Sequence, residues 1–381
     1  MCGCARSWSR HSRFVLTASK DWNVAVWDLA RACVPAQRRA TLRFDAPVVG
    51  ASFHPRNSRI ILALLSTGEA YVVDQRRAHR GRVELCEVQD ESDDEGAGPS
   101  VRVRSAITVA RFDSSGKHIF AGTSGGHILV FNTRTKTMVA RHKITGAGAI
   151  KGLEFTKTGR QLVANSADRT LRQFTVPLYA PPSADGAYVE QELEPTHRFH
   201  DPINKTAWHA MSYSPDGEWL AGGAADTATH KIYIWDISNE GQFASALDGG
   251  REPLLHLHWH PHKSAIASTT NQGNILIWHC PHPERWGAFA GGFEELDENV
   301  EYEEREDEFD IEDETAMIAR KMKEEEEEVD IDTVPEAAKP RDVQLHGVLP
   351  GDEDVAWADE EPDDDLEGWK MNVIMEEDWD T

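Results

Sequence analysis

The sequence has few cysteines and no long apolar run. Its 381 residues include five cysteines, at positions Cys2, Cys4, Cys33, Cys86 and Cys280. Because their number is odd and their spacing scattered, they predict no disulfide framework, which favours a reducing compartment. The longest strongly apolar run, around Ile60 to Leu65, is too short for a transmembrane helix. The N-terminus also lacks the apolar stretch of a secretory signal.

Basic residues are scarce at one end of the chain. Of 65 acidic and 40 basic residues, 37 acidic and 7 basic lie from Glu294 onward, which leaves 28 acidic and 33 basic before it. The sequence therefore predicts a mildly basic body followed by a strongly acidic tail. Mutual repulsion and sparse apolar content predict that residues 336–381 are disordered.

Catalytic and cofactor motifs are missing as well. Residues Gly122 to Gly126 fit the G-x-S-x-G pattern of a nucleophile elbow, but strand-like HIFA precedes them and HILVF follows, which predicts a turn between strands. The glycines of ITGAGAIKG do not have dinucleotide-loop spacing, and no phosphate-binding lysine motif occurs. We find no acid–base pair or activated nucleophile, so the expectation is a protein without catalytic activity or cofactor.

Four histidines alternate in LLHLHWHPHK, at His256, His258, His260 and His262. Alternate residues share one face of a strand, but neighbours on that face are ~7 Å apart, too far for two to bind one zinc ion undistorted. His260 also stands where other repeats place a turn residue. The pattern favours a polar strand face and a turn, with no metal site.

A six-fold repeat runs through the body of the chain. In each unit an aromatic residue ends a strand, and a turn, an apolar strand, small residues and a second strand follow. The first aromatic markers are Trp8, Phe53, Phe112, Phe155, Tyr213 and Trp259, and the second strands end near Trp27, Val73, Phe131, Phe174, Trp235 and Trp278. The endings VAVWDL and IYIWDI resemble those of WD repeats. This similarity predicts an all-β WD-repeat β-propeller over residues 1–290.

Ring closure is the open point of this prediction. Almost nothing precedes Trp8, so either the chain lacks an upstream repeat, which we favour, or six blades close as a strained ring. Insertions lie at about 82–106 and 177–206. The stretch QDESDDEGAGPS in the first is polar and acidic, which predicts a disordered loop tip, and the prolines and glycine of PLYAPPSADGAYVEQELEP in the second predict a loop.

Large apolar side chains are spaced through the acidic stretch Glu294 to Glu314. Of its 21 residues 14 are acidic, yet it holds Leu296, Val300, Tyr302, Phe309 and Ile311. Such side chains suit docking onto another surface, as an extended segment or a helical turn, and the carboxylates favour a basic partner. The alternative is a disordered acidic spacer. We assign residues 291–335 as a docking segment.

Together, the propeller and the segment WGAFAGGFEELDENVEYEEREDEFDIEDE after it resemble the retinoblastoma-binding protein five family. The likeness runs from about Trp8 to Trp286, includes NKTAW, and is most specific from Phe293 to Glu314. The resemblance implies a seven-bladed scaffold subunit of COMPASS/MLL-type histone H3 lysine-4 methyltransferase complexes. It also implies a nuclear location and stimulation of the SET-domain subunit by the segment after the propeller.

The resemblance assigns partners residue by residue. The SET-contacting set is Glu295, Leu296, Asp297, Glu298, Asn299, Val300, Tyr302, Glu303 and Arg305. A SPRY-domain subunit would bind Glu308, Phe309, Asp310, Ile311 and Glu312. A second WD-repeat subunit would bind Glu328, Val329, Asp330, Ile331 and Asp332.

Three features depart from the family pattern. An N-terminal repeat is lacking, Ile331 replaces a valine, and the tail stays acidic where the family has a basic region. Basic propeller loops, Arg76-Arg77 and Arg80 to Arg82, are left as weak candidate contacts to a nucleosome. No membrane or small-molecule partner is expected. The competing prediction is an acidic-tail histone-binding or chaperone propeller, and Trp357, Trp369 and Trp379 in the tail have no assignment.

Overall fold

In the computed structural model the described residues are 3–30, 37–77, 79–89, 101–103, 106–179, 188–201, 207–279 and 357–358. They belong to the first of two compact units, which comprises residues 1–279 and 345–381. The second unit, residues 280–344, lies wholly outside the described residues. Within the described part of the chain, no helix is long and apolar enough to cross a membrane.

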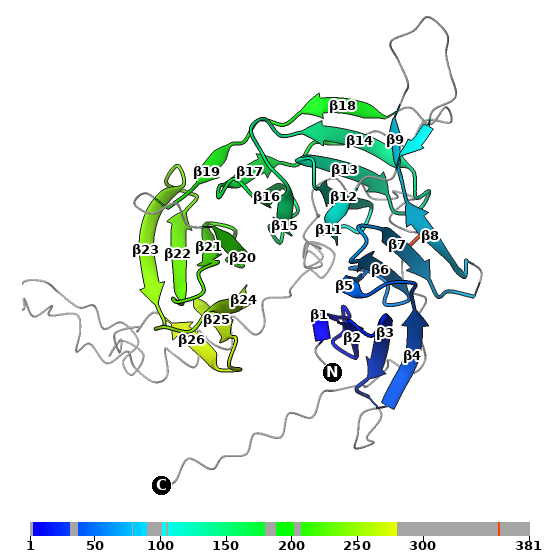
Figure 1. Cartoon of the computed structure of the whole chain (residues 1–381), viewed down its shortest axis with the longest axis horizontal. Coiled ribbons are helices and arrows are strands. Elements are labelled where there is room, and N and C mark those ends of the chain that lie inside the picture. The colour runs from blue at the N-terminus through cyan, green and yellow to red at the C-terminus, as the bar shows by residue number, and fades with distance from the viewer. Residues whose placement is uncertain are drawn as a thin grey trace, which may run out of the picture. The chain divides into compact units, whose positions relative to one another are not determined.

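The described residues form six successive blade sheets, which confirms the predicted all-β propeller with six visible blades. Figure 1 shows the first strand of each sheet on the inside of the arc and the later strands progressively further out. The first sheet comprises β1 (Gly3–Trp8), β2 (Phe14–Ser19), β3 (Asn23–Asp28) and β4 (Gln37–Arg43). The second comprises β5 (Val48–Phe53), β6 (Ile60–Leu65), β7 (Ala70–Asp74) and β8 (Gly81–Leu85).

The remaining sheets repeat this antiparallel order. The third comprises β11 (Ile107–Phe112), β12 (His118–Thr123), β13 (His127–Asn132) and β14 (Met138–Lys143). The fourth comprises β15 (Ile150–Phe155), β16 (Gln161–Ser166), β17 (Leu171–Thr175) and β19 (His197–Phe199). The fifth comprises β20 (Trp208–Tyr213), β21 (Trp219–Ala224), β22 (Lys231–Asp236) and β23 (Gln242–Asp248). The sixth comprises β24 (Leu254–Trp259), β25 (Ala265–Thr270) and β26 (Ile275–His279).

The aromatic markers fall where the repeat predicted. All six of the first series end the inner strand of a blade, at β1, β5, β11, β15, β20 and β24. A polar side chain follows each marker, and several of these cap the next turn. Ser9 and Ser214 accept backbone N–H groups through Oγ, and His54 does so through Nδ1. The capping explains why short polar residues recur at this position.

A blade inside the series is buried on both faces, and β6 shows how its sequence achieves this. All six of its residues are buried. Since strand side chains alternate between faces, Ile61, Ala63 and Leu65 pack against the first blade, whereas Ile60, Leu62 and Leu64 pack against the third. The run IILALL is therefore apolar without alternation, as a strand covered on both sides requires.

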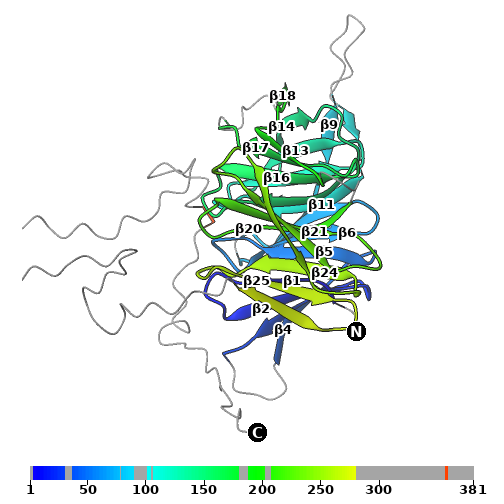
Figure 2. The same cartoon turned by 90° about the vertical axis from the view of Figure 1, so that its left-hand side faces the viewer.

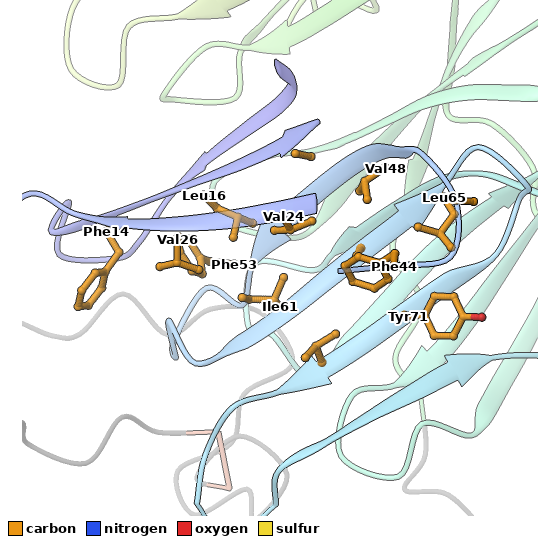
Figure 3. Close-up of a cluster of buried hydrophobic side chains, with 14 residues drawn as sticks. Phe14, Leu16, Val24, Val26, Phe44, Val48, Phe53, Ile61, Leu65 and Tyr71 are labelled. Atoms are coloured by element: carbon orange, nitrogen blue, oxygen red, sulfur yellow. The ribbon is translucent and has the colours of Figure 1, made fainter. Parts of the chain in front are cut away.

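Apolar clusters between neighbouring blades make up the core. Figure 3 shows the first of them, where Phe14, Leu16 and Val24 of the first blade meet Phe53 and Ile61 of the second. Four further clusters join the following blades in order. Viewed after a 90° turn, the labelled strands of the different blades, among them β11, β5 and β24, appear at successive levels (Figure 2). No blade completes its core alone, because each contributes only half of a cluster.

Both insertions contain strands that the sequence reading missed. In the first, β9 (Glu87–Gln89) and β10 (Val101–Val103) pair as a hairpin. In the second, β18 (Val189–Glu192) adds to β14 in parallel, and β19 completes the fourth blade. The second insertion was predicted as a loop, which is wrong for β18 and β19. The loop tip predicted in the first insertion starts at Gln89, and its residues 90–100 lie outside the described residues. Short strands at an exposed edge carry polar side chains, so their composition resembles that of a loop.

The ends of the blade series are not packed on each other as the neighbouring blades are. Successive inner strands are in contact from β1 to β5 and onward to β24, but among the described strands no contact of that extent joins β24 to β1. Ile275 and Ile277 of β26 are 68% and 71% exposed, and Trp8 at the other end is also exposed. The described strands therefore show no strained closure of six blades into a ring.

Candidate docking surfaces

All three predicted partner-contacting sets, from Glu295 to Asp332, lie outside the described residues. The last described strand before them is β26 (Ile275–His279). β26 ends at His279 and is the outer strand of its sheet, whereas the five preceding blades each have a fourth strand. Within the described residues, β26 therefore presents an unpaired backbone edge at the end of the blade series.

The basic loop after β7 is engaged within the molecule. The Arg76 side chain is 14% exposed and forms a two-pronged ion pair with Asp74, with Nε 3.1 Å from Oδ1 and Nη2 2.8 Å from Oδ2. Arg82 lies 2.6 Å from Asp45 and over the rings of Phe44 and Tyr71. The other two arginines of the predicted basic loop, Arg77 and Arg80, are exposed.

Trp357 of the acidic tail contacts this same loop. Nη1 of Arg76 donates a hydrogen bond to its carbonyl oxygen at 2.6 Å, and the guanidinium carbon lies 4.0 Å from the indole centroid. Nζ of Lys136 lies 4.5 Å from the same ring, and the His79 ring is 5.9 Å away. The next residue, Ala358, is 2% exposed and belongs to the apolar cluster between the second and third blades.

His79, Arg134, Lys136 and Trp357 line a groove, and burial there makes the charged form of Lys136 less favourable. Loss of solvent lowers the pKa of Lys136 to about 8, and Arg76 acts in the same direction while Asp74 opposes both. Lys136 is held in place by its backbone, which has a left-handed φ of 60°, and by a bond from Nζ to the carbonyl of Arg134. The groove is therefore a rigid cationic site against an aromatic ring.

The motifs with a catalytic or metal-binding pattern fall in ordinary propeller positions. Gly122 to Gly126 span the turn between β12 and β13, which confirms the strand–turn–strand prediction. His260 caps the turn after β24, where its Nδ1 accepts the N–H groups of His262 and Lys263, both at 3.0 Å. Within the part of the chain that the structure describes, no three His, Cys, Asp or Glu side chains form a group able to hold a metal ion.

Comparison with known proteins identifies the class first. Residues 2–28 match the family described as WD domain, G-beta repeat, and residues 20–179 match the N-terminal domain described as Nucleolar protein 10-like. The β-propeller domain of Cps50 (Swd1) from Myceliophteria thermophila superposes with a TM-score of 0.62 at 30% identity, covering 73% of this chain and 84% of that one. With six blades in register, the chain is a WD-repeat β-propeller protein.

The relatives then identify the family. The Set1 complex component swd1 of Schizosaccharomyces pombe is 33% identical over 81% of this chain and 73% of its own length. The COMPASS component SWD1 of Saccharomyces cerevisiae is 30% identical over 86% and 74%. The retinoblastoma-binding protein 5 homolog of Drosophila melanogaster is 36% identical over 87% of this chain, which spans 63% of that relative. The chain belongs to the Swd1/retinoblastoma-binding protein 5 family.

Proposed function

We propose that the protein is a non-catalytic, nuclear scaffold subunit of a histone H3 lysine-4 methyltransferase complex. The observation that carries the proposal is the similarity to two yeast proteins named as components of the Set1 complex and of COMPASS, which extends over more than four fifths of the chain. A propeller whose described residues form no His, Cys, Asp or Glu group able to hold a metal ion suits a role in holding partners together.

In this proposal the segment after β26 docks on the SET-domain subunit. Leu296, Val300 and Tyr302 supply apolar anchors, and the surrounding carboxylates select a basic surface. Binding restricts motion within the SET domain and raises the fraction of it that is competent for turnover. Coupling of this kind is typically ~1–3 kcal/mol, which corresponds to a stimulation of about 5- to 150-fold.

Two further contacts complete the proposed assembly. Phe309 and Ile311 anchor the SPRY-domain subunit, and Val329 with Ile331 forms a β-branched pair for a second WD-repeat subunit. The valine-to-isoleucine difference at position 331 adds one methylene to a side chain of the same β-branched shape. Nucleosome contact is limited to the exposed basic residues of the propeller loops, Arg77 and Arg80.

The test replaces the apolar anchors and keeps the charge. Serine at Leu296, Tyr302, Phe309 and Ile311 should reduce methylation of histone H3 by the reconstituted complex at least about tenfold and weaken assembly. A matched control changes Glu301, Glu304 and Glu306 to glutamine, which alters charge but no anchor. Loss of activity in the glutamine control, with the serine variant fully active, would support the alternative of a charge-driven histone chaperone and reject the proposed docking.

A further inference from the structure

Trp357 is held by contacts that recognise both its backbone and its side chain. Arg76 donates to the Trp357 carbonyl while its guanidinium lies against the indole ring. Asp74 holds the other two nitrogens of Arg76, so the guanidinium is already positioned for the contact with Trp357. A pre-positioned arginine loses little side-chain entropy when a ligand arrives, which is what a binding site requires and a random surface contact lacks.

The adjoining Ala358 shows that the groove also selects a small residue. Its side chain is among the buried members of the cluster that contains Val72, Leu85 and Met138. These three residues come from β7, β8 and β14, so the alanine enters the seam between two blades. A larger or charged side chain would meet a packed core at this point.

Charge complementarity points to the same occupant. The groove is lined by Arg134 and Lys136 as well as His79. The tail around Trp357 reads DEDVAWADEEPDDD, with carboxylates on both sides of the tryptophan and no basic residue. Tryptophan is the aromatic side chain that attracts cations most strongly, and acidic flanks add attraction at longer range.

We propose that the groove formed by Arg76, His79 and Lys136 between the second and third blades is a docking site for an acidic tryptophan peptide, and that this chain's own Trp357-Ala358 segment is its resident ligand. The last described blade strand ends at His279, and Trp357, 78 positions later in the sequence, contacts the propeller. The proposal concerns residues outside 291–335 and holds whichever partner that segment binds.

Competition between a free peptide and the tethered segment tests this directly. A fluorescently labelled peptide of residues 350–365 is titrated with the full-length protein and its Trp357→Ala variant, and binding is followed by anisotropy. An attached ligand competes at an effective concentration of roughly 0.1–1 mM, so the unaltered protein should bind the peptide at least about tenfold more weakly than the variant. A Trp369→Ala protein, matched in residue type and acidic setting, should behave like the unaltered one.

Two further arms make the outcome decisive. A peptide with alanine at position 357 keeps every charge and should bind the Trp357→Ala protein at least about tenfold more weakly than the original peptide. Adding Lys136→Asn to the Trp357→Ala protein should weaken binding of the original peptide. Asparagine is chosen because it tolerates the left-handed backbone at position 136. An Ala358→Asp protein, changed only in the tail, should bind the peptide as Trp357→Ala does, and it replaces that variant if the latter folds poorly.

Equal binding by the unaltered and Trp357→Ala proteins would show that the tail does not occupy the groove and would overturn the proposal. Equal binding of the tryptophan and alanine peptides would overturn it as well, because it would reduce the interaction to charge alone. A groove that binds the peptide but is vacant in the unaltered protein would belong to a partner's tryptophan instead.

Discussion

His54 is a buried titratable residue whose environment favours one charge state. It is 1% exposed, its Nε2 lies 2.9 Å from the carbonyl oxygen of Gly116 in the next blade, and its Nδ1 accepts the N–H of Arg56. Both contacts suit a neutral imidazole that carries its proton on Nε2. Burial lowers the pKa of His54 to about 4, and the hydrogen bond to Gly116 opposes this shift.

The lowered pKa of His54 predicts acid sensitivity of the propeller. Between pH 6.5 and 4 the unfolded chain binds this proton and the folded chain does not, so the free energy of unfolding falls as the pH falls through that window. We expect His54 alone to cost about 1 kcal/mol between pH 7.5 and 5.5, and about 3 kcal/mol by pH 4. Urea unfolding across this pH range measures the loss.

The control is His54→Gln, whose amide can keep the donor to Gly116 but does not titrate. Its unfolding free energy should fall by about 1 kcal/mol less than that of the unaltered protein between pH 7.5 and 5.5. Burial also lowers the pKa values of His142 and His230, so some acid sensitivity should persist in the variant. Identical pH dependence in the two proteins would show that His54 does not carry the effect.

At the scale of elements, the turn between β12 and β13 depends on one glycine. Gly126 has a φ of +80°, and a Cβ there would lie 2.6 Å from the backbone oxygen of Ala147, which belongs to the connection between the third and fourth blades. A side chain at this position would therefore strain the turn and push two blades apart.

Replacing Gly126 by alanine should lower the free energy of unfolding by about 2–4 kcal/mol, measured by urea or thermal unfolding. Gly125→Ala is the matched control, since its φ is not in the left-handed region and its nearest neighbour would be a side-chain atom of His127 at 3.3 Å. We expect that change, and Ser124→Ala beside it, to cost under about 1 kcal/mol. A large loss at Ser124 would instead point to a role for the G-x-S-x-G serine.

The blade elements were predictable because their signal is local and repeated. The markers Phe53, Phe112 and Tyr213 recur at matching points of their repeats, and the structure ends an inner strand at each of them. The strands β18 and β19 gave no such signal, since HRF and YVEQE are short and polar and are held by pairing with β17 and β14. The bulge near the start of every inner strand, as between Val48 and Gly50, was likewise invisible in the sequence.

For the whole molecule, the proposed division of labour between propeller and tail predicts different outcomes for two truncations. A chain ending at Phe293 should retain the propeller and lose stimulation of the SET-domain subunit. A chain ending at Gln344 keeps all three predicted docking sets but lacks Trp357, and it should stimulate at nearly the full level. Methyltransferase rates of complexes reconstituted with each chain measure the difference, and full stimulation by the 1–293 chain would contradict the proposed function.

The same two chains also test what the contacts of Trp357 and Ala358 contribute to stability. Both lack Trp357 and Ala358, so both should show a slightly lower thermal midpoint than the whole protein, by a few degrees at most. Stability unchanged by removal of residues 345–381 would indicate that the Trp357 contacts add nothing to the fold.

The sequence by itself determined the class of fold, because a propeller blade is specified by residues close together in the chain: a capped turn, two alternating strands and small residues at fixed intervals. It also indicated the family, through the acidic segment that follows the last blade. Only the tertiary structure decided where Trp357 lies. That contact joins residues 281 positions apart, Arg76 and Trp357, and no local pattern encodes it. It depends on β7 and the β13–β14 turn bringing Arg76 and Lys136 to one groove, which happens only when two blades stack.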